Sequence, residues 1–231
     1  MSLFMLTYEE LQAILISLKV ASLSTIISLP VALLTGWVLA RKNFWGKSIV
    51  DGLIHLPMVM PPVTTGYILL ILLGTNGIIG RFLFNWFHIQ IAFSFTAVVI
   101  ASIIVSVPLM IRAIRTAFEM IDPAFEDTAK TLGDSGIIAF LRVSVPLAMP
   151  GIVSGTVLCF ARSLGEFGAT ISFAGNIQGK TQTIALAIYE QMQIPNHEEI
   201  TVRLVIISAS ISLIAMIFAE YINKNRLKKR I

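Results

Sequence analysis

Two pairs of ionisable side chains stand at a spacing that could support acid–base chemistry. Asp51 and His55 are four residues apart, and so are Arg162 and Glu166. Residues at this spacing share one face of a helix, so the two members of each pair can interact. An enzyme site within a membrane would need such a pair inside an apolar segment, and no other pair comes near this. The alternatives are a hydrated helix end for Asp51 and His55, and a structural ion pair for Arg162 and Glu166.

A third stretch, from Ala174 to Thr181, nearly matches the phosphate-binding pattern G-x-x-x-x-G-K-[ST]. Ala174 replaces the first glycine, and no hydrophobic strand precedes the stretch, so we interpret it as a loop that binds no ATP. No Cys and His cluster has metal-site spacing. The single cysteine, Cys159, is predicted to be a buried apolar filler. A Ser, His and Asp set assembled only by folding stays an open alternative.

The composition places these residues in a membrane. The chain has 231 residues, of which 56% are hydrophobic and 13% charged, and its mean hydropathy is +0.84. A soluble domain carries about 25% charged residues. Backbone polar groups in a bilayer must be satisfied internally, so we expect one membrane domain of helices over residues 1–231. Five apolar runs have about the 20 residues that cross the hydrocarbon: Val20–Ala40, Ile49–Leu73, Ile91–Ile111, Val143–Ala161 and Leu204–Ile222.

The positive residues predict an orientation. If the basic cluster from Lys224 to Arg230 faces the cytoplasm, five spans leave most of the 17 Lys and Arg on that side. This bias follows the positive-inside rule and predicts a periplasmic N-terminus and a cytoplasmic C-terminus. The net charge of +4 is expected of such a protein and needs no nucleic acid as partner.

Two outer segments, Gly74–Gln90 and Ser163–Val202, are too long to be simple turns. The first is rich in aromatic residues, which suit a membrane interface. It could instead be a sixth, short or re-entrant segment, although its polar residues disfavour a full span.

The cytoplasmic loop at about residues 119–142 has the signals of a short rigid helix. Asp122 suits the N-cap and Pro123 the first helical position. A helix is then predicted over Ala124–Leu132, and Gly133 can end it in a left-handed conformation. Gly136–Val143 is predicted to begin a second helix that runs into the fourth span. A partner that grips a rigid element can move it, whereas an ordinary amphipathic linker, which is the alternative, would absorb the motion.

The spacing in this loop resembles that of ABC importer permeases. Asp127, Thr128, Ala129, Gly133 and Pro146 stand where that family has Glu-Ala-Ala, three residues, Gly, nine residues and Ile-x-Leu-Pro. Asp for Glu and Thr for Ala are mild departures. The resemblance implies that the loop couples the chain to an ATPase through these residues: Ala124, Glu126, Asp127, Thr128, Ala129, Leu132, Gly133 and Pro146.

Three prolines, Pro57, Pro61 and Pro62, interrupt the second span. Each removes a hydrogen-bond donor and clashes with the preceding turn, so we expect this span to be kinked or unwound. Irregular backbone at membrane depth is tolerated where it is buried in protein or lines a water-filled cavity. The stretch is therefore a candidate for a transport pathway, with a purely structural kink as the alternative.

This stretch resembles the Leu-Pro-x-Val-x-Pro-Pro segment of molybdate permeases. The segment from Arg162 to Thr170 also resembles that family, and the resemblance covers nearly the whole chain. It makes the following residues candidates for the pore or gate: Pro57, Pro61, Pro62, Thr64, Thr65, Gly66, Arg162, Ser163, Gly165, Glu166 and Thr170.

The resemblance implies the type I ABC importer permease fold, an all-α integral membrane protein with about five transmembrane helices, six being possible, and a cytoplasmic coupling helix. It implies import of molybdate across the bacterial inner membrane by alternating access, with tungstate or sulfate as alternative substrates.

The implied partners are a second copy of the chain, two cytoplasmic ABC ATPase subunits, a periplasmic molybdate-binding protein and membrane lipid. ATP and magnesium would bind the ATPase subunits, while this chain would bind no cofactor and would not itself be an enzyme. A secondary transporter or channel that works without ATP is the alternative from another class, and it would have no use for the coupling loop.

Overall fold

The computed structural model describes residues 6–228, and for residues 219, 220 and 222–228 it describes the backbone alone. Every regular element in this described part is a helix, which confirms the predicted all-α class. The elements are α1 (Tyr8–Arg41), α2 (Lys47–Val59), α3 (Pro62–Leu73), α4 (Ile78–Phe87), α5 (Phe95–Glu119), α6 (Ala124–Thr131), α7 (Gly136–Ala139), the π-helix η1 (Phe140–Ser144), α8 (Val145–Leu164), α9 (Gly168–Phe173), α10 (Ile184–Gln191) and α11 (Glu198–Lys228). The basic side chains between Lys224 and Arg230, used above for orientation, lie outside the described side chains.

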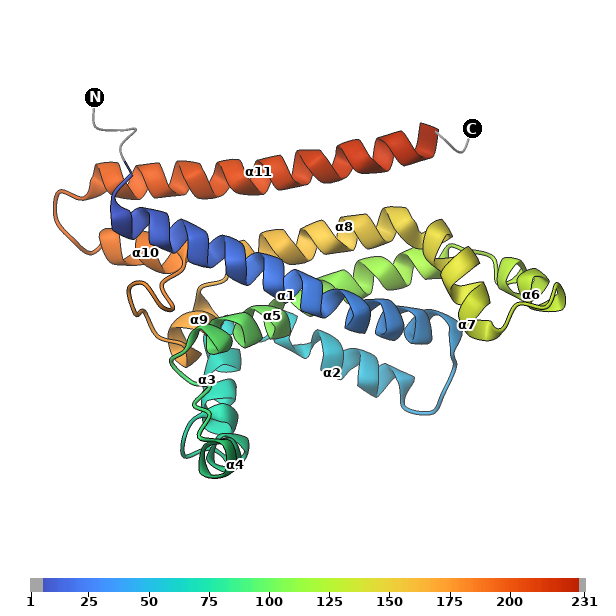
Figure 1. Ribbon diagram of the computed structural model, residues 1–231, viewed down its shortest axis with the longest axis horizontal. Helices are drawn as coiled ribbons and strands as arrows, with labels where there is room; N and C mark the ends of the chain where they lie inside the picture. Colours follow the sequence, from blue (N-terminus) through green and yellow to red (C-terminus); the bar gives the residue numbers. More distant parts are fainter. Residues whose placement is uncertain (1–5, 229–231) are drawn as a thin grey trace.

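Four long helices, α1, α5, α8 and α11, run along the long axis of the molecule (Figure 1). The short helices α6 and α7 lie at one end of this bundle, and α3 and α4 project from its side. α1, α5, α11 and the continuous helix Gly136–Leu164 are each long and apolar enough to cross a membrane, and the bent pair α2–α3 can supply a fifth span. The prediction of about five spans is confirmed.

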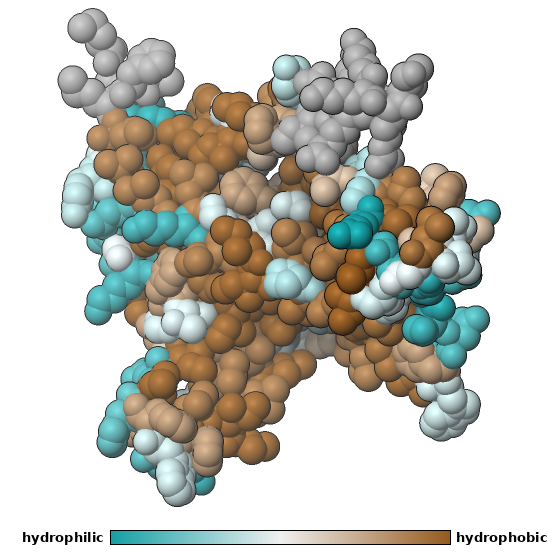
Figure 2. All heavy atoms as spheres, turned by 45° about the vertical axis from the view of Figure 1, so that its right-hand side comes forward, coloured by the Kyte–Doolittle hydropathy of each residue, from teal (hydrophilic) through white to brown (hydrophobic). Residues whose placement is uncertain are grey.

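The surface is that of a protein dissolved in lipid. Apolar residues cover most of the face seen in Figure 2, with polar residues toward its margins. Along α1 the usual pattern of soluble proteins is inverted, because Ile26 and Leu34 are exposed while Ser24 and Ser28 are buried. Small polar residues allow close helix packing in membranes and can hydrogen-bond across it. The Ser24 hydroxyl lies 2.8 Å from that of Ser163, which joins α1 to α8.

The main core lies where α1, α5 and α8 meet, near the end that carries α6. Phe118, Ile114 and Met110 of α5 are fully buried there against Leu39 of α1 and Ala148 of α8. This packing fixes the position of the loop at about residues 119–142, because α5 leads into α6 and α8 follows it.

The first and last spans are longer than predicted. We expected them to begin at Val20 and Leu204, but α1 begins at Tyr8 and α11 at Glu198. The physical reason is a buried ion pair, in which both carboxylate oxygens of Glu10 accept hydrogen bonds from the Arg203 guanidinium at 2.7–2.9 Å. Each charge is satisfied by the other helix, so both helices can extend through polar residues.

The second span is broken, as its prolines predict, but more sharply than a kink. α2 ends at Val59, α3 begins at Pro62, and the two helices are bent by 110°. Pro62 takes the first helical position of α3, where a missing N–H has no cost. Pro57 lies within α2 and does not mark the break, so only two of the three prolines interrupt the helix.

Candidate functional site

Helix α6 is the short rigid element that the sequence predicts in the loop at about residues 119–142. Its N-cap position is Pro123, one residue later than expected, although the Asp122 carboxylate still caps it by accepting a hydrogen bond from the Ala124 amide at 2.9 Å. At the other end Gly133 has φ +100°, in the predicted left-handed conformation. Two hydrogen bonds close this end, from the Gly133 amide to Lys130 and from the Asp134 amide to Ala129. This is a Schellman cap, and it gives α6 a defined length and orientation.

The following helix joins α6 to the membrane part without a flexible link. Ser135 caps α7 through its hydroxyl, and α7, η1 and α8 form one continuous helix over Gly136–Leu164. The prediction that a second helix runs from the loop into the fourth span is confirmed. Pro146 is the second residue of α8.

A buried hydrogen-bond network around Glu126 fastens α6 to two spans. One oxygen of its carboxylate, Oε1, accepts hydrogen bonds from the Ser144 hydroxyl at 2.6 Å, the Arg41 Nε at 3.1 Å and the Trp37 Nε1 at 3.5 Å. Arg41 also donates to the backbone carbonyl of Ile121 at 2.9 Å. The side chains of Glu126 and Arg41 are only 8% and 11% exposed. The network therefore ties the middle of α6 to the end of α1 and the beginning of α8.

The protonation of Glu126 reflects this network. Burial raises the pKa of its carboxyl, but the hydrogen bonds from Ser144, Arg41 and Trp37 and the charge of Arg41 outweigh burial, so its pKa is lowered. At neutral pH the residue is an anion held against a cation. No local pattern indicates this role, since Arg41 is 85 residues away and is otherwise one of many basic residues at a span end.

The remaining predicted coupling residues divide between two sides of α6. Ala129, like Glu126, is buried against the chain itself, so both hold the helix in place. The outward side carries Asp127, Thr128 and Leu132, of which Leu132 is 83% exposed. Asp127 pairs with Lys130 at 3.0 Å, and the Thr128 hydroxyl donates to the Ala124 carbonyl at 2.7 Å. This side is free for a partner, and contact with an ATPase stays a prediction.

The structure brings two of the predicted pore segments together. The beginning of α3 packs so closely on α9 that a Cβ on Gly66 would lie 2.4 Å from the Ala169 carbonyl oxygen. Thr65 on α3 and Thr170 on α9 are both buried, and their hydroxyls have no hydrogen-bond partner among the described residues. Thr64, by contrast, is exposed. The broken backbone at Pro61 is therefore braced by α9 from the opposite half of the chain.

Arg162 and Glu166 form the predicted ion pair, at 2.7 Å, although they do not share a helix. α8 ends at Leu164 with Gly165 as its C-cap, so Glu166 lies just beyond the helix. Its second oxygen accepts a hydrogen bond from the Ala169 amide at 2.8 Å, and the side chain is 1% exposed. Glu166 thus links the end of α8 to the start of α9, beside the broken span, and Ser163 binds α1 as described above.

The near-match to a phosphate loop folds onto itself. It lies between α9 and α10, where the Thr181 hydroxyl accepts a hydrogen bond from the Ile177 amide and donates to the Gly175 carbonyl. In the described part of the chain no strand precedes it, so the strand–loop–helix setting of a phosphate loop is missing there.

Comparison with known proteins agrees with this architecture. Residues 29–228 match the family described as "Binding-protein-dependent transport system inner membrane component". The chain belongs to this family. It is therefore a multi-span permease component of an inner-membrane transport system, which agrees with the four to five candidate spans of its all-α fold.

Two relatives are similar over almost their full length. The molybdenum transport system permease protein ModB of Haemophilus influenzae is 49% identical over 95% of this chain and 96% of its own. The protein of the same name from Escherichia coli K12 is 48% identical over 94% and 95%. Among solved structures, a bacterial ABC transporter involved in alginate import superposes with a TM-score of 0.75 and 17% identity, covering 95% of this chain and 80% of that one. The MetNI methionine ABC transporter superposes with a TM-score of 0.71 and 12% identity, over 94% and 95%. At these identities the structures support the fold alone.

Proposed function

We propose that this chain forms the transmembrane pathway of an ATP-driven molybdate importer in the inner membrane. Two similar proteins named for molybdenum transport, 48% and 49% identical over nearly the whole chain, support the substrate. The observation that carries the mechanism is the Glu126 network, which fixes a capped, exposed helix to two membrane spans.

The assembly we propose has four subunits in or on the membrane. Two copies of this chain form the pathway, and two ABC ATPase subunits bind the outward sides of the two α6 helices. ATP and magnesium bind the ATPase subunits, and this chain holds no cofactor. A periplasmic binding protein delivers molybdate at the opposite end, where α1 begins. The N-terminus is then periplasmic and the C-terminus cytoplasmic.

Force would pass from α6 to the pathway through rigid contacts. When ATP brings the ATPases together, each moves the α6 that it grips. Glu126 transmits this motion to α1 and to η1, which continues into α8, because its buried carboxylate accepts hydrogen bonds from Arg41 and Ser144. α8 leads through Arg162 and Glu166 to α9, and α9 packs on the broken backbone at Pro61–Pro62. The pathway would then alternate between openings on the two sides, with ATP hydrolysis resetting it.

Sulfate is the second candidate substrate. The sulfate transport system permease protein CysT of Salmonella typhimurium is 34% identical over 77% of this chain. Molybdate is favoured because identity to the molybdenum permeases is higher and extends over almost the whole chain.

The test is uptake of radiolabelled molybdate by proteoliposomes that contain the chain with its ATPase, binding protein and ATP. We expect uptake that excess tungstate blocks and excess sulfate does not, because tungstate has nearly the same size and charge as molybdate. Competition by sulfate would instead assign the chain to sulfate transport. Uptake that persists without ATP or without the ATPase would contradict the proposal in favour of a secondary transporter or channel.

A further inference from the structure

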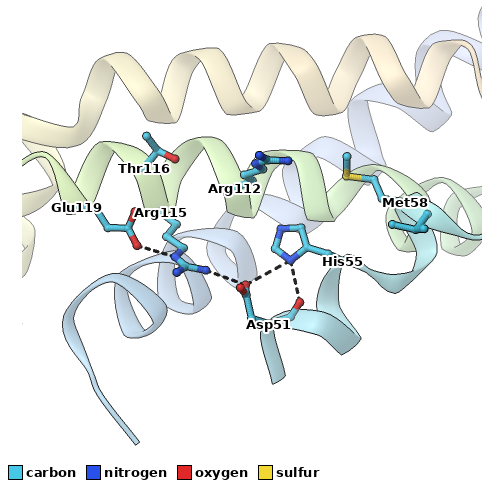
Figure 3. Close-up of a pocket in the computed structure, with 8 residues that line it drawn as sticks. Asp51, His55, Met58, Arg112, Arg115, Thr116 and Glu119 are labelled. Carbon is cyan, nitrogen blue, oxygen red and sulfur yellow. Dashed lines mark hydrogen bonds and ion pairs between the residues drawn. The ribbon is translucent and has the colours of Figure 1, made fainter. Parts of the chain in front are cut away.

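A hollow of about 410 Å³ with ionisable side chains in its lining opens between α2 and the last turns of α5, near the end that leads to α6. Figure 3 shows its side chains. The residues that line it are Asp51, His55, Met58, Val59, Arg112, Arg115, Thr116 and Glu119.

Five of these side chains are ionisable, yet they belong to helices of the membrane-spanning part. Ionisable groups in spans almost always face a water-filled space or a protein interior, since facing hydrocarbon is costly. α2 has no fully buried residue, and only one side of it, at Ile54, packs against the main core. The hollow is therefore a place where water reaches between the spans on the α6 side.

Both acidic groups of the hollow pair with one arginine, which balances one of their two negative charges. Arg115 donates from Nη1 to Asp51 at 2.8 Å and from Nε to Glu119 at 2.7 Å. The ring Nδ1 of His55 lies 2.9 Å from the Asp51 carbonyl oxygen and 3.4 Å from its carboxylate. The pairing of Asp51 with His55 that the sequence predicts is present, but Arg115 is the stronger partner.

Arg112 stands apart from this network. Figure 3 shows it on the same helix without an interaction to the other residues drawn. It is exposed, and no hydrogen bond or ion pair joins it to any described residue. Thr116, one turn further along α5, is exposed as well. Asp51 and Glu119 are both paired with Arg115. Arg112 is therefore a cation in a hydrated hollow, and the N–H groups of its guanidinium have no partner among the described residues.

We propose that Arg112, with the Thr116 hydroxyl beside it, contacts the transported tetrahedral oxyanion on the cytoplasmic side of the pathway, before the anion is released. The planar donor fork of a guanidinium matches the oxygens of a tetrahedral anion. The two carboxylates keep the whole hollow nearly neutral, so the contact is weak. Weak contact suits a transport pathway, because the ion must also leave. The inference rests on the proposed function.

The test uses a reporter cysteine that needs no transport. Val59→Cys places an exposed thiol in the lining of the same hollow and leaves Arg112 and Thr116 unchanged, and the native Cys159 is fully buried and will not compete. The complete complex with its ATPase is treated with a positively charged thiol reagent, with and without millimolar molybdate, at constant ionic strength set with sodium chloride. We expect molybdate to slow the modification, and we expect this protection to disappear when Arg112→Gln is added. No protection, or protection that survives Arg112→Gln, would overturn the inference.

Transport gives a second measurement without the reporter cysteine. Arg112→Gln should reduce ATP-dependent molybdate uptake about tenfold, as expected for the loss of one charge-assisted contact, and Arg112→Lys should reduce it less. Arg81→Gln is the matched control, because Arg81 is exposed on α4 and donates only a long hydrogen bond to a backbone carbonyl, so uptake should be unchanged.

The outcomes separate this inference from the proposed function. Normal uptake by Arg112→Gln in a working molybdate importer would overturn the inference and leave the function intact. If the complex carries no molybdate but sulfate protects the reporter only when Arg112 is present, the function fails and the anion site stands. Dissociation of the Arg112→Gln complex on size exclusion would assign Arg112 to a subunit contact and overturn the inference.

Discussion

Replacing Glu126 by glutamine should detach the coupling helix α6 and uncouple ATP hydrolysis from uptake. Glutamine keeps the size of the side chain and can still accept the hydrogen bond of Ser144, but it removes the charge. Arg41, which is 11% exposed, is then left as a buried cation with no carboxylate. The same change should leave the ATPase subunits untouched, since Glu126 faces its own chain.

The size of the effect follows from the burial of this pair. Breaking a buried ion pair by removing one partner costs about 3–5 kcal/mol. We expect about 3 kcal/mol here, the lower end, because Glu126 and Arg41 keep some access to water and the Ser144 contact remains. Each 1.4 kcal/mol is a factor of ten, so the detached form of α6 becomes roughly a hundred times more populated.

The assay measures ATP hydrolysed per molybdate imported in proteoliposomes, together with the melting temperature of the purified complex. We expect Glu126→Gln to raise the ATP ratio several-fold and to lower the melting temperature. Glu199→Gln is the matched control, because Glu199 is exposed at the beginning of α11, and it should change neither quantity. Adding Arg41→Gln to Glu126→Gln should recover part of the lost stability, since no buried charge is then left alone.

Acid should reproduce the effect in the wild-type chain. The pKa of Glu126 is lower in the folded chain than the ordinary value of about 4.3. Its stabilising contribution is therefore fully present above about pH 4.3 and is lost as pH falls through the lowered pKa. Glu126→Gln should lack this part of the acid dependence. An unchanged ATP ratio and melting temperature in Glu126→Gln would refute the reasoning.

Three further changes test other parts of the proposed path of motion from α6 to the broken second span. Gly133→Val should strain the left-handed cap at φ +100° by about 1–3 kcal/mol and raise the ATP used per molybdate, because the end of α6 loses its shape. Replacing Pro61 and Pro62 together by alanine should let α2 and α3 straighten from their 110° bend, and uptake at normal expression should fall. Gly66→Ala should push α3 away from α9, because its Cβ would lie 2.4 Å from the Ala169 carbonyl oxygen, so the melting temperature should fall by the equivalent of about 1–3 kcal/mol and uptake should fall with it.

Each of these substitutions has a control in the chain. Gly136→Ala and Gly52→Ala introduce a Cβ that meets nothing within 4 Å, and neither glycine has a positive φ. Pro195→Ala removes an exposed loop proline. These variants should behave as the wild type. Wild-type coupling in Gly133→Val would contradict the role given to the α6 cap. Unchanged uptake after loss of both Pro61 and Pro62 would contradict the role of the broken span. An unchanged melting temperature in Gly66→Ala would contradict the role of the contact between α3 and α9.

Much of the fold can be predicted from local signals in the sequence. Continuous apolar runs specify the spanning helices, and Gly133 with the residues around Asp122 specifies α6 and its ends. The break at Pro61–Pro62 follows from the missing donors of proline. These features depend on neighbours in the chain, so the sequence alone is enough.

The parts that could not be predicted depend on partners far apart in the chain. The predicted spans Val20–Ala40 and Leu204–Ile222 stop short of Glu10 and Arg203, but these two side chains neutralise each other within the bundle. Glu126, one of the predicted coupling residues, anchors α6 within its own chain through Arg41, Trp37 and Ser144, which its neighbours in the sequence do not indicate. Such pairs form only when folding brings α1 beside α11 and α6 beside α1, so local patterns in the sequence do not predict them.

The most direct test of the account is whether ATP hydrolysed on a partner drives accumulation of molybdate through this chain. Proteoliposomes with the complete complex and binding protein should concentrate labelled molybdate inside when ATP is present, and should not when the ATPase cannot hydrolyse it. Accumulation that continues with the inactive ATPase, or an active ATPase that moves no molybdate, would contradict the account.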